Sequence, residues 1–151
     1  MGTTVERHTH VDFEEGVECL IGEREAIANV TYAKFMGVVF ILFGIVGIPY
    51  AGETLLGIGL TPAHNFLHIM TGVLWIAAVM TFDGTYARML NQVIGLAYLT
   101  LGAFGLSESV PQIHVLFNLN EMTTVFNVVI GLVTLGVGWG VNTSHLKHWW
   151  P

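Results

Sequence analysis

Two histidines are the residues in this chain whose type and spacing most suggest chemistry. His64 and His68 lie four residues apart in the stretch LTPAHNFLHIMTG, residues 60–72. On a helix this spacing places both imidazoles on one face, where they can ligate a metal ion, and His68 alone can ligate a haem or a chlorophyll. The metalloprotease pattern needs a glutamate directly after the first histidine, but Asn65 stands there. The pair is therefore a candidate ligand site that lacks the general base of that enzyme class.

A structural role is the alternative for the same residues. A polar side chain at membrane depth normally faces the interior of a helix bundle and has a hydrogen-bond partner there. We expect His68 to donate a hydrogen bond toward Asn127, with Asn65 also packing between helices. This role is favoured over cofactor binding by His68 or His64. No metal site is predicted, because no acidic residue inside the apolar segments completes a set of metal ligands. Packing hydrogen bonds are also expected from four further polar side chains, those of Asn91, Gln92, Tyr98 and Thr100.

No pattern in the sequence indicates catalysis. Cys19 is the only cysteine, which excludes an intramolecular disulfide and a cysteine-based metal cluster. We find no nucleophile paired with a base, no phosphate-binding loop and no buried carboxylate pair, so no catalytic residue is predicted and the protein is not expected to be an enzyme. The remaining histidines near the two termini are expected to be solvated: His8, His10, His145 and His148.

The elements that position these residues must be membrane-spanning helices. Of the 151 residues, 53% are hydrophobic and only 11% are charged, whereas about a quarter of the residues of a soluble domain are charged. Four segments, at about 35–50, 63–82, 87–106 and 122–141, are long and apolar enough to cross a bilayer as helices. Thr61 and Pro62 are typical of a helix start. The predicted fold is an all-α bundle of four transmembrane helices, occupying residues 31–142.

The basic residues predict the orientation of this bundle. All five fall on one side of the predicted spans, at Arg7, Arg24, Lys34, Arg88 and Lys147. By the positive-inside rule both termini are therefore cytoplasmic. Residues 1–30 carry no signal-peptide pattern and are expected to form a cytoplasmic segment, amphipathic over 13–28. Residues 143–151 are expected to form a cytoplasmic interfacial tail, because they contain Trp149 and Trp150.

The four spans contain an internal repeat. The glycines of the first span recur in the third at a constant offset: Gly37, Gly44 and Gly47 match Gly95, Gly102 and Gly105. The second span matches the fourth in the same way: Leu60, His68 and Gly72 match Leu119, Asn127 and Gly131. This predicts a duplicated two-helix hairpin whose parallel halves are related by an axis along the membrane normal. The glycines are expected to let the helices pack closely.

These motifs resemble a known family. The chain is similar, over about residues 32–139, to small bacterial four-helix membrane proteins of unknown function with an Asn-x-x-His-x-x-x-Gly signature, here Asn65, His68 and Gly72. Tyr86-Ala87-Arg88 also matches. Members often have a second histidine in the last span, where this chain has Asn127. The resemblance implies the four-helix fold and a bacterial inner-membrane location. Similar proteins occur in phototrophic and in other bacteria, so a photosystem accessory role is one of the roles considered.

From these observations we expect a non-catalytic accessory subunit of a larger membrane complex, photosynthetic or respiratory in type. Its partners would be membrane lipids and other integral membrane subunits, and no nucleic acid. One alternative is a protein that binds a chlorophyll, bacteriochlorophyll, haem or metal through His68 or His64. Coloured purified protein would favour it. The other alternative is a small-molecule channel, which requires a water-lined path past Asn65, His68 and Asn127.

Overall fold

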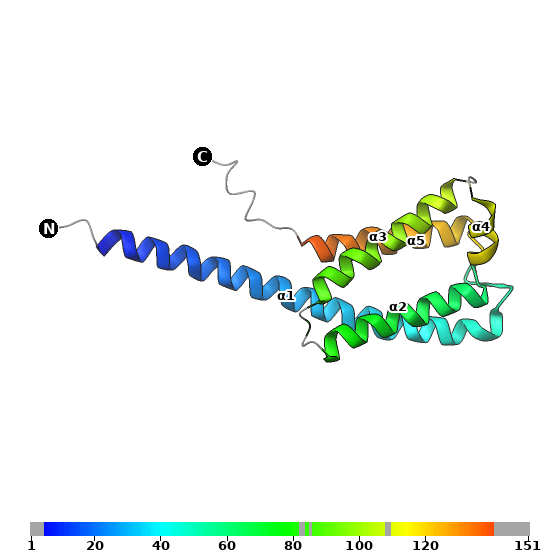
Figure 1. Cartoon of the computed structure of the whole chain (residues 1–151), viewed down its shortest axis with the longest axis horizontal. Coiled ribbons are helices and arrows are strands. Elements are labelled where there is room, and N and C mark those ends of the chain that lie inside the picture. Colours follow the sequence, from blue (N-terminus) through cyan, green and yellow to red (C-terminus); the bar gives the residue numbers. More distant parts are fainter. Residues whose placement is uncertain (1–4, 82–83, 85, 108–109, 141–151) are drawn as a thin grey trace.

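The computed structural model describes residues 5–81, 84, 86–107 and 110–140. Within them four long helices form a bundle: α1 (Val5–Gly47), α2 (Pro62–Thr81), α3 (Ala87–Leu106) and α5 (Glu121–Trp139) (Figure 1). Each is apolar and long enough to cross a bilayer, over Ala26–Tyr50, Pro62–Met80, Ala87–Leu106 and Glu121–Trp139. Large apolar side chains cover their outward faces, as at Phe35, Leu42, Val93 and Leu132. The chain is therefore a multi-pass membrane protein whose helices present apolar surface to lipid.

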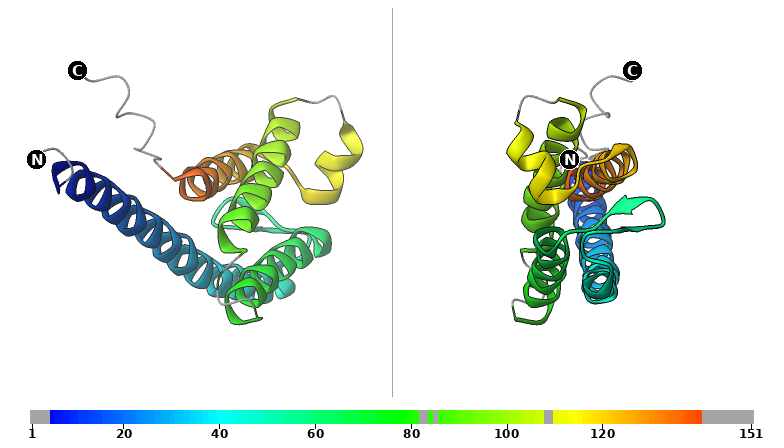
Figure 2. Two further views of the ribbon diagram at one scale, coloured as in Figure 1. Left: turned by 60° about the vertical axis from the view of Figure 1, so that its left-hand side comes forward. Right: turned by 90° about the vertical axis from the view of Figure 1, so that its right-hand side faces the viewer.

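Short elements connect the helices at the end of the bundle opposite the start of α1 and the end of α5 (Figures 1 and 2). The connection from α1 to α2 contains a 3-10 helix, η1 (Ile48–Tyr50), and two strands, β1 (Thr54–Leu55) and β2 (Ile58–Gly59). The strands pair antiparallel, with Thr54 opposite Gly59. The connection from α3 to α5 contains the short helix α4 (Pro111–Phe117). The sequence had predicted only loops here.

The predicted spans 63–82, 87–106 and 122–141 are confirmed as α2, α3 and α5. The first span was predicted too short, from residue 35, because Lys34 was taken as its boundary. α1 already packs in the bundle at Asn29, whose side-chain oxygen accepts a hydrogen bond from the Asn91 amide at 2.8 Å. Lys34 is exposed on the outer face of α1, and a long lysine side chain there can reach the headgroup region.

α1 begins outside the bundle and then continues into it. Its helix is continuous from Val5 to Gly47, so it runs without a break through the predicted boundary at residue 30. Its N-terminal part projects beyond the other helices (Figure 1). The side chains that would make residues 13–28 amphipathic lie largely outside those that the structure describes, so this character stays a prediction. The predicted tail, 143–151, also lies outside the described residues.

The helices pack in two close pairs, α1 with α2 and α3 with α5, with much smaller contacts between the pairs. Glycines bring the backbones together in both. A Cβ atom added to Gly72 would lie 2.6 Å from the Gly37 carbonyl oxygen in the first pair. In the second pair, a Cβ added to Gly131 would lie 3.0 Å from the Gly95 carbonyl oxygen. The small residues therefore allow the near contact of backbones that holds helices together in lipid.

Interlocked aromatic rings fill the middle of the bundle. The ring of Phe40 packs edge-on against those of Trp75 and Tyr98, with centroids 5.2 and 5.5 Å away. A polar network lies toward the end where α1 projects. There Asn91 accepts a hydrogen bond from Trp75 Nε1 at 2.8 Å and donates one to Asn29. This core joins the two helix pairs and leaves the histidines of α2 between itself and the connecting elements.

Candidate functional site

His64 lies in the first turn of α2, directly under the connecting elements. The Thr61 hydroxyl accepts a hydrogen bond from the His64 backbone N–H at 3.1 Å, so the predicted helix start at Thr61-Pro62 is confirmed. The His64 side chain is 1% exposed. Its Nδ1 donates to the carbonyl oxygen of Gly59, at the end of β2, at 2.9 Å. The ring of Phe117, the last residue of α4, packs edge-on against it. The two connections therefore enclose His64.

His68 lies one turn deeper and is 0% exposed. Phenylalanine rings from two other helices surround it edge-on: Phe40 and Phe43 from α1, each with a centroid distance of 5.1 Å, and Phe126 from α5 at 6.0 Å. The Tyr98 ring of α3 lies parallel to the imidazole at 6.4 Å. All four spans thus contribute to the environment of His68, which is aromatic rather than polar.

The predicted juxtaposition of the two histidines is present in the structure. Their ring centroids are 4.4 Å apart and the ring planes are tilted by 42°. Three of their four ring nitrogens have no hydrogen-bond partner among the described residues, namely His64 Nε2 and both nitrogens of His68. The backbone carbonyl of Phe117 is also near His64.

The hydrogen bond that we expected between His68 and Asn127 is absent. Asn127 is 0% exposed, but neither of its side-chain polar atoms has a partner among the described residues. The ring of Phe126, the neighbour of Asn127 in sequence, packs on His68 instead. Helical spacing places a residue on a face but does not set the direction of its side chain across the bundle, which explains the error.

Asn65 is not part of the site formed by the two histidines. Its side chain packs directly against Gly47 of α1, and a Cβ atom at Gly47 would collide with its amide. Asn65 is buried, as expected for a residue that packs between helices, yet both of its amide atoms lack a hydrogen-bond partner within the described ranges. Thr124 of α5 packs in the same manner against Gly105 of α3. These two residues therefore belong to the helix pairs and not to the histidine site.

With this geometry established, comparison with known proteins gives one match. A family model described as a domain of unknown function, DUF4383, covers residues 30–140. The chain belongs to this family. No curated protein and no solved structure matches the chain. The DUF4383 region contains both histidines and most of the packed bundle, but it leaves out the projecting N-terminal part of α1 and Asn29.

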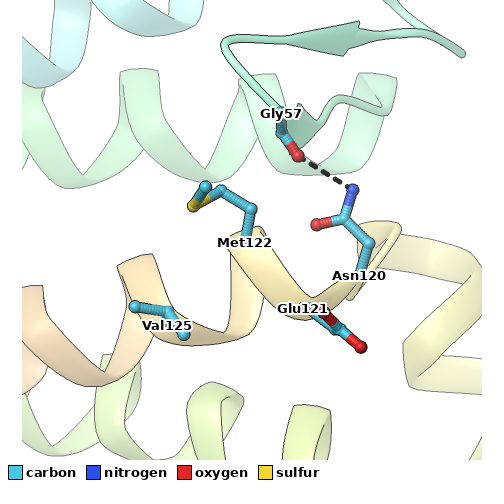
Figure 3. A pocket seen from close by; sticks show the side chains of 5 residues that line it. All are labelled: Gly57, Asn120, Glu121, Met122 and Val125. Atoms are coloured by element: carbon cyan, nitrogen blue, oxygen red, sulfur yellow. Dashed lines mark hydrogen bonds between the residues drawn. The ribbon is translucent and has the colours of Figure 1, made fainter.

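A tetrapyrrole does not fit the histidines of the DUF4383 region. An axial ligand must face a space as wide as the macrocycle, whereas ring edges and connecting elements enclose both imidazoles. The described residues line three open hollows at the connecting end of the bundle, and neither histidine is among the lining residues. Figure 3 shows one of these, which is lined by Gly57, Asn120, Glu121, Met122 and Val125. Among the described residues, no group of three or more histidine, cysteine or acidic side chains is placed to hold a metal ion.

The sequence missed part of the polar network of the bundle. Asn91 and Gln92 do make hydrogen bonds between helices, as expected, and Tyr98 lies 3.3 Å from the Thr71 hydroxyl. Thr100 instead donates to the Leu96 carbonyl of its own helix. Asn29, and Tyr32, which lies 2.6 Å from the Thr134 hydroxyl, were not expected in the network. Both precede the span predicted from residue 35, so a corrected start of that span would have revealed them.

Proposed function

We propose that the chain is a non-catalytic accessory subunit of a larger membrane protein complex. One observation carries the proposal, namely that α1 extends well beyond the bundle. Its 43 residues span about 65 Å at about 1.5 Å per residue, roughly twice the hydrocarbon thickness of a bilayer. Its span begins only at Ala26. A helical segment outside the bundle has only marginal stability in water unless it packs against a partner.

The place of this extension supports a partner-specific role. The family match begins at residue 30, so the projecting part of α1 is not within the region that the family model describes. A bundle common to the family would then be joined to one complex by a segment particular to this chain. The host complex that we propose is photosynthetic or respiratory in type. Its location in a bacterial inner membrane is what the resemblance carried by Asn65, His68 and Gly72 implies.

We also propose that the extension is cytoplasmic. The α2–α3 connection, the projecting end of α1 and the end of α5 lie on the same side of the bundle (Figure 1). Arg88 lies at this end and donates hydrogen bonds to the backbone carbonyls of Gly138 and Trp139. Basic residues gather on the cytoplasmic side of membrane proteins. The opposite, connecting end would then face away from the cytoplasm.

The bundle itself is proposed to be a duplicated hairpin. Equivalent positions of the two halves make reciprocal contacts at the connecting end, which supports the repeat seen in the sequence. The Thr61 hydroxyl donates to the Leu116 carbonyl at 2.6 Å, and the Asn120 amide donates to the Gly57 carbonyl at 3.1 Å (Figure 3). The glycine contacts of the two helix pairs also correspond, since Gly37 meets Gly72 as Gly95 meets Gly131.

The two alternatives from the sequence receive less support. A bound chlorophyll, bacteriochlorophyll or haem has no open face at His64 or His68. A channel would need a polar path through the middle of the bundle, where Phe40, Trp75 and Tyr98 are packed together. Neither alternative explains the projecting helix.

The test is purification from native membranes in mild detergent, with identification of every protein that co-elutes. We expect the full-length chain to co-elute with a defined set of membrane subunits. A variant without residues 5–22 should lose them and keep the melting temperature of its bundle. A control variant without residues 143–151 should retain the partners. Retention of the same subunits by the first variant, or a full-length chain that elutes alone, would overturn the proposal.

A further inference from the structure

We propose that the hollow beneath the β1–β2 hairpin binds a membrane phospholipid whose headgroup carries a primary ammonium group, as phosphatidylethanolamine does. The hollow has a volume of about 490 Å³ and is lined by Gly57, Asn120, Glu121, Met122 and Val125 (Figure 3). Clefts of about 300–1,000 Å³ commonly hold small molecules. This one lies at the first residue of the fourth span, and therefore at the depth of the lipid headgroups. The site does not depend on the proposed role as a subunit.

The hairpin forms a fixed roof over the hollow. A two-residue turn of Leu56 and Gly57 joins the strands, and both residues have a positive φ, 53° and 83°. The Asn120 amide donates to the Gly57 carbonyl at 3.1 Å, and its side-chain oxygen accepts from the Thr123 N–H at 2.8 Å. A Cβ atom added to Gly57 would lie 3.5 Å from the Met122 side chain. The hairpin tip is therefore held at the start of α5, and the hollow is preformed.

The turn residue Leu56 indicates contact with lipid. Two-residue turns with positive φ at both positions normally have asparagine, aspartate or glycine there, because larger side chains are strained in the left-handed region. Leu56 occupies such a position and is 83% exposed. Covering a leucine side chain with apolar lipid is favourable. The sequence thus departs from the local rule at a position where lipid contact would compensate.

An apolar strip on α5 continues from the hollow and is suited to an acyl chain. Met122, Val125, Val129 and Leu132 are each more than half exposed. Their spacing places them along one face of the helix. The first two line the hollow, and the other two lie further along the span. A phospholipid with its headgroup in the hollow would therefore have an acyl chain along this strip.

The charge of the hollow selects the headgroup. Glu121 is exposed and is the one charged side chain among the five residues that line the hollow. The two connections with the first residue of α5, residues 48–61 and 107–121, contain Glu53, Glu108 and Glu121 but no lysine or arginine. A carboxylate without a basic neighbour attracts an ammonium group and repels the phosphate of an anionic headgroup.

The carboxylate of Glu121 also distinguishes between two zwitterionic headgroups. The primary ammonium group of phosphatidylethanolamine can donate a charge-assisted hydrogen bond to a carboxylate. The quaternary ammonium group of phosphatidylcholine has no N–H and cannot. We therefore expect phosphatidylethanolamine to bind best, phosphatidylcholine less well, and the anionic phosphatidylglycerol least.

A second hollow provides an internal comparison. It has a volume of about 410 Å³ and lies at the start of α2, where its lining includes Pro62 and Phe66. In the proposed repeat these residues correspond to Glu121 and Val125. None of the described residues that line the second hollow is charged. A lipid bound there should therefore show no preference for a headgroup.

The experiment is native mass spectrometry of the full-length protein in detergent, with an equimolar mixture of the three phospholipids carrying identical acyl chains. We expect one molecule of phosphatidylethanolamine to be preferred over phosphatidylcholine by about fivefold, the upper range for an exposed ion pair. Glu121→Gln should abolish this preference. Glu53→Gln is the matched control, because Glu53 is exposed at the same end but does not line the hollow, and it should keep the preference. Both variants change exposed side chains, and their melting temperatures will verify the fold.

Photo-crosslinking in native membranes identifies the occupant directly. A photoreactive residue in place of Val125, whose side chain is 56% exposed, should become attached to phosphatidylethanolamine. Attachment to another protein would assign the hollow to a partner subunit and would overturn the proposal.

Two further results would overturn the lipid site. One is equal binding of phosphatidylethanolamine and phosphatidylcholine by the wild type, and the other is an unchanged preference in folded Glu121→Gln. Neither result bears on whether partner subunits co-elute through the extension of α1, so the lipid site and the subunit role are tested separately.

Discussion

Single polar side chains join helices from opposite halves of this bundle. Asn91 of α3 is the centre of one such group, because its amide binds both the Trp75 indole of α2 and the Asn29 amide of α1. All three residues are buried in the bundle. In lipid, interhelical hydrogen bonds contribute about 0.6 kcal/mol on average and at most about 1.7 kcal/mol each. The group is therefore important mainly because removing its centre takes a hydrogen bond away from each of two buried side chains.

Asn91→Ala should lower the free energy of unfolding by about 1–3 kcal/mol, since a buried polar atom left without its partner costs about that much. The measurement is a denaturant titration of the protein in mixed micelles. Thr100→Ala is the matched control, because the Thr100 hydroxyl is exposed and bonds only its own helix. We expect its effect to be within about 0.5 kcal/mol. Equal losses for the two variants would show that the network does not stabilise the bundle.

Close contact between helix backbones is the main feature at the scale of the elements. Gly72→Ala would place a Cβ atom 2.6 Å from the Gly37 carbonyl oxygen, and backbone atoms cannot move aside as side chains can. We expect a loss of about 1–3 kcal/mol, as for other overpacked sites, measured by the same unfolding titration.

Gly136→Ala is the control for this prediction. A Cβ atom at Gly136 meets nothing within 4 Å, so the higher helix propensity of alanine should leave stability unchanged or raise it by up to about 1 kcal/mol. If Gly136→Ala destabilised the bundle as much as Gly72→Ala, the contact of backbones would not be the reason that glycine is needed at position 72.

The start of α2 gives a second prediction at this scale. The Thr61 hydroxyl caps α2 and also donates to the Leu116 carbonyl across the two connections. Thr61→Ala should therefore cost about 1 kcal/mol or more, since loss of an N-cap alone costs about that much. Thr54→Ala, on the exposed strand β1, is expected to have little effect on the melting temperature. A Thr61→Ala protein that melts like the wild type would contradict this assignment.

Most of the fold could be predicted from the sequence, because long apolar segments bounded by charges or turn residues determine α2, α3 and α5. The start of α1 could not, since Lys34 interrupts the apolar pattern while facing outward. The elements β1, β2 and α4 were missed because they are short and depend on distant contacts. One such contact is the hydrogen bond from the Gly59 N–H to the Thr123 hydroxyl at 2.8 Å. Another is the hydrogen bond between His114 and the Phe104 carbonyl.

The candidate site was predicted in part. Helical spacing was enough to place His64 and His68 together, because neighbouring turns of one helix have a fixed geometry. The surroundings of His68 come from three other helices, and their rotations about their own axes are not encoded in spacing. For that reason the aromatic enclosure and the missing bond to Asn127 emerged only from the structure.

The molecule as a whole is polarised, with the projecting part of α1 and Arg88 at one end and the connecting elements at the other. This predicts a labelling pattern in intact cells. Cys19 should resist a membrane-impermeant maleimide, because the extension of α1 is cytoplasmic in our proposal. A Cys19→Ser protein with Glu53→Cys, placed in the connection between η1 and β1, should react. Mass shifts of the purified protein report the labelling, and the reverse pattern would invert the proposed topology.

Two reciprocal hydrogen bonds join the connections, from Thr61 to Leu116 and from Asn120 to Gly57. They imply that the two halves of the molecule have complementary surfaces, so that each half specifies how the other packs against it. The peptide link between α2 and α3 is then not needed to specify the assembly. A gene split at residues 82–86 should yield two fragments that find each other in the membrane. The same complementarity would allow a circular permutant, and would allow two copies of the chain to exchange halves when they are crowded.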